Sequence, residues 1–164
     1  MEQQISKIAL GGGCHWCTEA VFQSLKGIIN VEQGFVSSIG DNSTFSEAII
    51  VRFNPEYISL SILIEIHLHT HKSTSNHSMR KKYRSAIYTF SDHQKERSEI
   101  IIKALQKDFN SELVTKVYQF MAFKPSRTAI QNYYQKNPNK PFCKTFIDPK
   151  LKLIFTSFSE YSSL

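Results

Sequence analysis

The chain has 164 residues, of which 41% are hydrophobic and 21% charged, as in globular proteins with a substantial core. The net charge of +6 comes from scattered lysines and arginines without a recognition motif, so we expect no nucleic-acid partner. No apolar stretch reaches about 18 residues, the length of a membrane span, and Met1–Gln4 lacks the basic, apolar pattern of a signal peptide. We therefore expect a cytoplasmic protein, and we also expect it to be a monomer. Its three cysteines, an odd number, favour redox or catalytic use over a disulfide framework.

The pattern of apolar residues predicts an alternation of strands and helices. Five strands are expected where β-branched and aromatic residues gather, at 5–10, 28–36, 48–53, 85–90 and 113–121. Four helices are expected, at 16–25, after Ser59 through His67, after Ser91 or Asp92 through Leu105, and after Ser126 through Tyr134. Residues 67–82 are interpreted as a long surface loop that leads into an exposed basic cluster, Arg80–Arg84, and 142–164 as a mixed tail.

The first six elements follow the order strand, helix, strand, strand, helix, strand, which is that of a ferredoxin-like split βαβ arrangement. We therefore expect an α+β fold, with a mixed sheet, helices on one face and a C-terminal extension wrapped around it. No repeat, low-complexity tract or linker interrupts the chain, so residues 1–164 are expected to form a single domain. Cys14 would lie at the carboxyl end of the first strand, where open sheets often carry their sites.

The stretch Gly11-Gly12-Gly13-Cys14 joins the first predicted strand to the first predicted helix. Glycines allow the backbone to turn sharply and to approach a bound molecule closely. The first turn of a helix has unpaired N–H groups and a partial positive charge, and both stabilise a thiolate. The sequence therefore predicts that Cys14 is a reactive thiol.

Three sets of residues compete as partners of Cys14. Cys14 and Cys17 have the Cys-x-x-Cys spacing of dithiol–disulfide oxidoreductases. The second possibility is Cys14 acting with a distant acid and a distant thiol. The third is a metal site drawn from the two cysteines and three nearby histidines, His67, His69 and His71. These histidines fit neither a strand nor a helix as a set, so we expect no metal.

Five segments, in one order, resemble those of the peptide methionine sulfoxide reductase A family. They are Gly13-Cys14-His15-Trp16, then Gln33 to Ser38, Glu47 to Pro55, Lys82 to Tyr88, and Gln131 to Pro138 followed by Cys143. The chain departs from the family pattern in having His15 where the family has Phe and Cys17 where it has Gly. It also lacks a match for the second catalytic tyrosine.

The resemblance implies an oxidoreductase that reduces methionine S-sulfoxide, free or in proteins, and so repairs proteins after oxidative stress. Cys14 would attack the sulfoxide sulfur, while Glu47 supplies a proton and the hydroxyl of Tyr83 binds the oxygen. His15 and Trp16 would form the pocket that receives the methyl group of the substrate.

The resemblance also implies how the enzyme is regenerated. The sulfenic acid on Cys14 would condense with a second thiol, Cys143 or Cys17, and thioredoxin would reduce the disulfide without a metal or organic cofactor. Two other functions stay open from the residues alone. One is a general dithiol–disulfide oxidoreductase that uses Cys14 and Cys17, and the other is a degenerate, non-catalytic homologue that only binds.

Overall fold

The computed structural model describes residues 4–164, and Met1 to Gln3, part of the amino-terminal stretch considered above, lie outside the described residues. The strands are β1 (Ser6–Gly11), β2 (Ile28–Ser37), β3 (Ser46–Phe53), β4 (Ala86–Thr89), β5 (Lys116–Gln119) and β6 (Ala122–Pro125). The α-helices are α1 (His15–Gln23), α2 (Leu60–His69), α3 (Asp92–Leu105), α4 (Tyr133–Lys136) and α5 (Asp148–Ser157). A π-helical segment, Cys143–Ile147, runs directly into α5. The fold is thus of the mixed α+β class, as the sequence predicts.

The six strands form one sheet in the order β5-β4-β1-β3-β2-β6. β1 lies at its centre, antiparallel to both β3 and β4, and β2 is antiparallel to β3. β5 is parallel to β4, whereas β6 is antiparallel to β2, so the sheet is mixed. β3 and β4, which flank β1, are buried at all but one of their positions.

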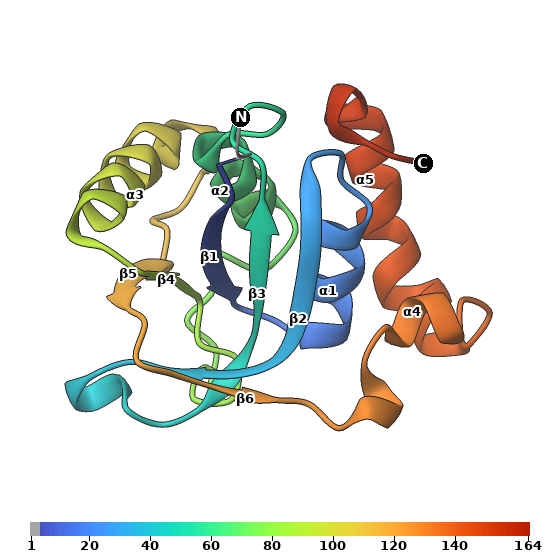
Figure 1. Cartoon of the computed structure of the whole chain (residues 1–164), viewed down its shortest axis with the longest axis horizontal. Coiled ribbons are helices and arrows are strands. Elements are labelled where there is room, and N and C mark those ends of the chain that lie inside the picture. The colour runs from blue at the N-terminus through green and yellow to red at the C-terminus, as the bar shows by residue number, and fades with distance from the viewer. Residues whose placement is uncertain (1–3) are drawn as a thin grey trace.

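The sheet is curled, because its two outermost strands are almost continuous in sequence. Only Phe120 and Met121 separate β5 from β6, which lie at opposite ends of the strand order. The amide of Phe120 donates to the carbonyl of Thr89 at 2.9 Å, and that of Met121 donates to Ser37 at 3.0 Å. Between these two residues the backbone hydrogen bonds therefore change from β4 to β2. In Figure 1, β6 crosses the lower edge of the molecule. The strand predicted over 113–121 is wrong beyond Gln119 for this reason.

The two faces of the sheet are packed differently, because successive side chains of a strand point in opposite directions. Ile8 and Leu10 of β1 belong to a core that includes Phe22 of α1, Leu63 of α2 and Ile101 of α3. The buried residues of the other face come from strands alone, and include Ala9, Ala48, Ile50 and Tyr88. The helices thus cover one face, as expected.

The helix starts follow simple capping rules. The hydroxyl of Ser59 accepts a hydrogen bond from the amide of Ile62 at 3.2 Å, and that of Ser91 accepts from Gln94 at 3.1 Å. Both caps were predicted. Ser126 is not a cap, because its hydroxyl has no hydrogen-bond partner and the next helical turn, Thr128–Ile130, begins after Arg127.

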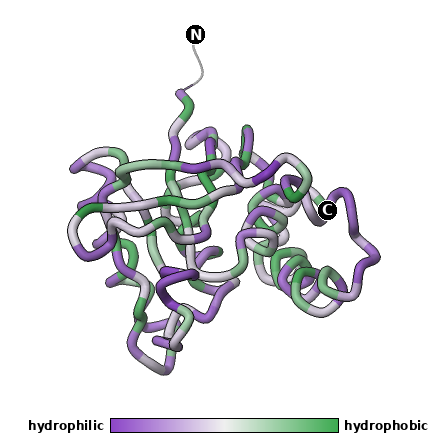
Figure 2. The backbone as a smooth tube through the Cα atoms, turned by 90° about the horizontal axis from the view of Figure 1, so that it is seen from below, coloured by the Kyte–Doolittle hydropathy of each residue, from purple (hydrophilic) through white to green (hydrophobic). Residues whose placement is uncertain are grey.

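The C-terminal third departs most from the prediction. In place of one helix after Ser126 there is a 3-10 turn, Thr128–Ile130, and the short α4, and Asn132 between them has a φ of 57°. The mixed tail forms α5, which buries Leu151 and Ile154 and lies beside α1 (Figure 1). In Figure 2 the coils near the C-terminus carry alternating hydrophobic and hydrophilic colour, as expected of helices with one buried face.

Within residues 4–164 no helix has both the length and the apolar composition to cross a membrane.

Candidate active site

The turn Gly11–Gly13 places Cys14 directly before the first residue of α1. The carbonyl of Gly11 accepts a hydrogen bond from Nε2 of His67 at 2.8 Å, and that of Gly12 accepts from the Arg80 guanidinium at 2.8 Å. Gly12 has a φ of 151°, a conformation that side-chain-bearing residues rarely adopt. The turn is therefore held by groups from α2 and from the loop that follows it.

The surroundings of Cys14 favour its thiolate. Its pKa is lowered from the ordinary value, first by a hydrogen bond from the thiol of Cys17 and also by the backbone N–H groups of Trp16 and Cys17. Burial and the negative charge of Glu47 oppose this lowering. Hydrogen bonds at the start of α1 thus outweigh the cost of desolvation, and the largest of them comes from a thiol rather than from the backbone N–H groups that the sequence prediction rests on.

All three thiols come together at α1. Cys17 and the fully buried Cys143 belong to one cluster, and Cys14 packs against it; the other buried members are Ala20, Ile147 and Leu151. The pKa of Cys17 is strongly raised, first by its hydrogen bond to Cys14 and then by burial. Burial also raises the pKa of Cys143. All three cysteines are free, and Cys17 interacts with both of the others.

Glu47 lies at the start of β3 and is buried. Its Oε1 accepts from the backbone N–H of His15 at 3.3 Å and lies 3.3 Å from Nε2 of the same residue. Its Oε2 lies 3.8 Å from Nζ of the exposed Lys82. The Nδ1 of His15 lies 2.8 Å from the carbonyl oxygen of Gly34 in β2. A carboxyl group is thus fixed beside Cys14 through the residue that follows it.

His15 and Trp16, expected to contact the substrate's methyl group, lie in different surroundings. The His15 ring is buried and stands edge-on to Phe35, with centroids 5.2 Å apart. The Trp16 ring stacks on Tyr133 at 4.0 Å and stands perpendicular to Phe142 at 5.4 Å. Of these residues only Phe142 lines the cavity at Cys14. The structure therefore does not bring either predicted pocket residue to the cavity wall.

The cavity at Cys14 has a volume of about 380 Å³. Cys14 and Cys17 lie in its wall, with Tyr83 from the long loop and the rings of Phe142 and Phe146 from the C-terminal segment; the wall also includes Gly12, Gly13, Thr18, Val21, His67, Thr70, His71, Lys72, His77, Met79 and Lys150. The structure thus brings Tyr83 to the cavity at Cys14, although 68 residues lie between them in the sequence. Its partly apolar wall suits a thioether-sized side chain.

The loop between α2 and β4 is more ordered than its composition suggests. The guanidinium of Arg80 donates to the carbonyls of Ser75, Tyr83 and Lys72 as well as to Gly12. Arg84 is buried and donates to the hydroxyl of Tyr88 and to Thr44. The prediction of an exposed basic cluster at Arg80–Arg84 is therefore wrong for Arg84 and incomplete for Arg80.

Lys150 is a site residue that sequence reasoning missed. It comes from α5, lines the cavity, and its Nζ donates to the carbonyl of Thr70. Burial lowers its pKa, while the nearby Cys17 and Cys14 oppose that change. No local pattern marks this lysine, because only the packing of α5 brings it to the thiols.

The histidines considered as metal ligands have other contacts. Nδ1 of His71 contacts the carbonyl of His67, and Nε2 lies 2.8 Å from the hydroxyl of Ser85. His69 faces away from this network, where it stacks on Phe109 and lies 3.6 Å from Oδ2 of Asp108. Glu65 approaches the same pair, and one ligand atom from each of the three lies within 4.8 Å of the others. His69 thus has an aromatic and a carboxylate neighbour on the side of α2 away from Cys14.

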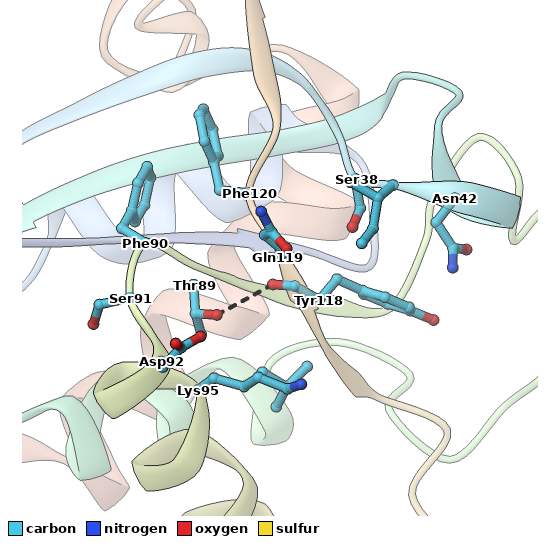
Figure 3. Close-up of a pocket in the computed structure, with 12 residues that line it drawn as sticks. Ser38, Asn42, Thr89, Phe90, Ser91, Asp92, Lys95, Tyr118, Gln119 and Phe120 are labelled. Carbon is cyan, nitrogen blue, oxygen red and sulfur yellow. Dashed lines mark hydrogen bonds between the residues drawn. The ribbon is translucent and has the colours of Figure 1, made fainter.

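A second hollow of about 530 Å³ lies beside the N-terminus of α3 and the ends of β4 and β5, where Thr89 donates to the carbonyl of Tyr118 (Figure 3). Hydroxyl, amide and aromatic groups line it, including Ser38, Asn42 and Gln119. Its wall contains none of the three thiols, Glu47 or Tyr83. The smaller cavity has Cys14, Cys17 and Tyr83 in its wall, whereas Glu47 and Cys143 line neither hollow.

The fold and the activated thiol together define a thiol-dependent oxidoreductase. A family model described as peptide methionine sulfoxide reductase matches residues 6–161. The chain is similar to peptide methionine sulfoxide reductase MsrA of Sulfolobus acidocaldarius, at 33% identity over 94% of this chain and 96% of that protein. It is also 32% identical to the MsrA of an Acinetobacter baumannii strain, over 90% of this chain and 92% of the relative. The chain belongs to the peptide methionine sulfoxide reductase family, which confirms the resemblance in its sequence.

Solved structures show the same fold. Reduced Mxr1 from Saccharomyces cerevisiae aligns with a TM-score of 0.76 and 23% identity, covering 87% of this chain and 91% of Mxr1. Methionine sulfoxide reductase A of Corynebacterium diphtheriae aligns with a TM-score of 0.73 and 20% identity, over 85% of this chain and 78% of that protein. Mxr1 in complex with Trx2 aligns with a TM-score of 0.64 and 20% identity, over 81% of this chain and 89% of that one.

Proposed function

We propose that Cys14 is the nucleophile in the reduction of methionine S-sulfoxide, free or within proteins. The observation that carries this proposal is a thiol with a lowered pKa in the wall of a partly apolar cavity, beside a buried carboxyl group. The thiolate of Cys14 attacks the sulfoxide sulfur. Glu47 provides the proton for the oxygen and the hydroxyl of Tyr83 binds that oxygen, so the S–O bond of the substrate can break. Methionine leaves and Cys14 becomes a sulfenic acid.

The aromatic and apolar groups of the cavity hold the substrate. Phe142 and Phe146 line it on the side of the C-terminal segment, and Trp16 supports Phe142 from behind. The roles expected for Trp16 and His15 in binding the methyl group thus become support for the wall and contact with Glu47. Thioether carbons and aromatic rings attract one another, which favours a methionine side chain here.

Cys17 and Cys143 regenerate Cys14. The thiol of Cys17 is hydrogen-bonded to Cys14, so it is placed to attack the sulfenic acid and release water. Cys143 lies in the same buried cluster as Cys17 and can then exchange into the disulfide. A thioredoxin-type dithiol reduces the final disulfide, and no metal or organic cofactor takes part. The complex of the related fold Mxr1 with Trx2 supports a reductant of this kind.

Several broader properties belong to this proposal. The order β4-β1-β3-β2 supports a ferredoxin-like split βαβ core, extended by β5 and β6 at its edges. The cavity wall draws on segments from Gly12 to Lys150, which supports a single catalytic domain over residues 1–164, and we propose that this domain acts as a monomer. Three free thiols are favoured in a reducing compartment, which supports a cytoplasmic location.

The proposal is tested by supplying the two sulfoxide epimers separately with a small dithiol as electron donor. Wild-type protein is expected to form methionine from the S epimer, and the Cys14→Ser variant to form none while keeping its fold by circular dichroism. Full activity of the Cys14→Ser variant would contradict the role of Cys14.

A second function, general dithiol–disulfide exchange, is favoured by the hydrogen bond between Cys14 and Cys17. Turnover of a methionine sulfoxide peptide is compared with turnover of a protein disulfide. Faster reduction of the protein disulfide, with no methionine released, would favour this second function.

A further inference from the structure

His15 and Glu47 form a buried pair behind Cys14, and their contacts fix where hydrogens must lie. Nδ1 of His15 is 2.8 Å from the carbonyl oxygen of Gly34, and a carbonyl oxygen only accepts. Nδ1 therefore carries a hydrogen. The other ring nitrogen, Nε2, lies 3.3 Å from Oε1 of Glu47.

A neutral His15 beside an ionised Glu47 would leave a conflict at this contact. The lone pair of Nε2 would face an oxygen of the carboxylate, and both side chains are buried, at 4% and 7% exposure. Buried polar atoms without a donor between them are costly. One hydrogen between Nε2 and Oε1 removes the conflict, whether it makes an imidazolium–carboxylate pair or a neutral acid–imidazole pair. The geometry thus requires one proton in the pair.

We propose that His15 and Glu47 hold this proton jointly and that it is the proton passed to the sulfoxide oxygen. His15 is then a positioning residue, since it reaches the substrate only through Glu47. This inference rests on the proposed role of Glu47 as the acid. The family has Phe at the position of His15, so the shared proton is a property of this chain.

One proton balances the first step of the reaction. The thiolate of Cys14 attacks the sulfoxide sulfur and forms an S–S bond to it. The S–O bond of the substrate then breaks, the protonated oxygen bonds to the Cys14 sulfur, and the S–S bond breaks with its electron pair returning to the substrate sulfur. With the proton from the pair, the products are a sulfenic acid and methionine, so the Cys14 sulfur is oxidised and the substrate sulfur is reduced. Reduction of the later disulfide by the external dithiol returns Cys14 as a thiol. When the Cys14 thiol ionises again, its proton passes back to the pair of His15 and Glu47.

The other groups around the pair agree with this assignment. Lys82 approaches Glu47 from the loop, with Nζ 3.8 Å from Oε2, and is exposed to solvent. Cys14 faces Glu47 from the turn, and a negative charge on Glu47 works against its thiolate. From β2 come only the carbonyl of Gly34 and the ring of Phe35, which are uncharged. A proton on the pair reduces the repulsion between two anionic groups at the site.

The test compares His15→Phe, which restores the family residue, with His15→Gln, whose amide cannot relay a proton. His93→Phe, on the exposed face of α3, is the matched control. Methionine release in a single turnover is followed across pH, with the S epimer as substrate. We expect both His15 variants to lower the single-turnover rate at saturating substrate about 10- to 100-fold, with an unchanged half-saturating concentration. This loss is smaller than the roughly 100-fold or more that removal of a general acid costs, because Glu47 remains in place. We expect the fall in rate on the alkaline side to begin at lower pH, and the control to match wild type.

A second readout does not depend on activity. The ¹⁵N shifts of the His15 ring in the folded enzyme are expected to show a protonated Nδ1 and an Nε2 that shares its hydrogen with Glu47. A wild-type rate and pH profile in folded His15→Phe, or an unprotonated Nδ1, would overturn the inference. Absence of methionine release by the wild-type enzyme would instead overturn the proposed function, so the two failures are distinguishable.

Discussion

The imidazole of His71 lies against the backbone of Gly12, so that a β-carbon on Gly12 would be 2.4 Å from Cδ2 of the ring. The same glycine has a φ of 151°. Gly12→Ala must therefore both strain the backbone and displace His71. We expect it to lower the free energy of unfolding by about 1–3 kcal/mol, the usual cost of overpacking, and to lower kcat/KM by moving Cys14.

Gly13→Ala is the matched control for Gly12→Ala. A β-carbon at Gly13 has no heavy atom within 4 Å. Its free energy of unfolding, measured with urea, should stay within about 0.5 kcal/mol of wild type. Equal stabilities of the two variants would show that His71 moves aside without cost.

Arg80 holds the loop between α2 and β4 to the turn Gly11–Gly13, because its guanidinium bridges the carbonyls of Gly12 and Tyr83. Arg80→Ala leaves these carbonyls without their donor, at a cost of about 1–3 kcal/mol for groups removed from water. We expect a raised KM for the sulfoxide, since Tyr83 is no longer fixed in the cavity wall. The neighbouring Lys81 is exposed, so Lys81→Ala should keep the wild-type free energy of unfolding and the wild-type KM. A wild-type KM for Arg80→Ala would show that Tyr83 is positioned by other contacts.

His67 makes the stability of the folded protein depend on pH. Burial lowers its pKa from 6.5 to about 4. The unfolded chain takes up this proton below about pH 6.5, while the folded protein does so only near pH 4, so stability falls as the pH drops through that window. A difference of this size corresponds to roughly 3 kcal/mol for one group. In urea unfolding, the free energy of unfolding of His67→Leu should fall less between pH 7 and pH 4.5 than that of wild type or of the exposed-site variant His93→Leu. Parallel pH curves for His67→Leu and wild type would contradict this assignment.

The parts of the molecule that the sequence predicts well depend on local patterns. β1, β2 and β3 are short runs of apolar residues, and Ser59 and Ser91 cap helices through bonds to residues three positions on. The prediction for Cys14 likewise rests on local sequence, because glycines and a helix start surround it. β6 and α5 were missed, since their positions depend on which distant segment they pack against.

The site was predicted only in part for the same reason. Glu47 and Tyr83 came from the family resemblance, because neither has a local feature that separates it from other acids and aromatics in the chain. The positions of Lys150 beside the thiols and of His15 against Glu47 follow from contacts between separate elements. His15 was expected in the substrate pocket because the family's Phe is there, but a ring with two polar nitrogens instead meets the polar groups of β2 and β3.

The hydrogen bond between Cys17 and Cys14 makes a prediction about thiol acidity. It is the first cause both of the lowered pKa of Cys14 and of the raised pKa of Cys17, so the thiol of Cys17 donates to the thiolate of Cys14. Cys17→Ala removes the donor, and the pKa of Cys14 should rise. The rate of alkylation of Cys14 by iodoacetamide, followed against pH, measures this change. Cys143 is not among the groups that lower the pKa of Cys14, so Cys143→Ala should leave the profile in place. An unchanged profile in Cys17→Ala would assign the acidity of Cys14 to the backbone N–H groups of α1 alone.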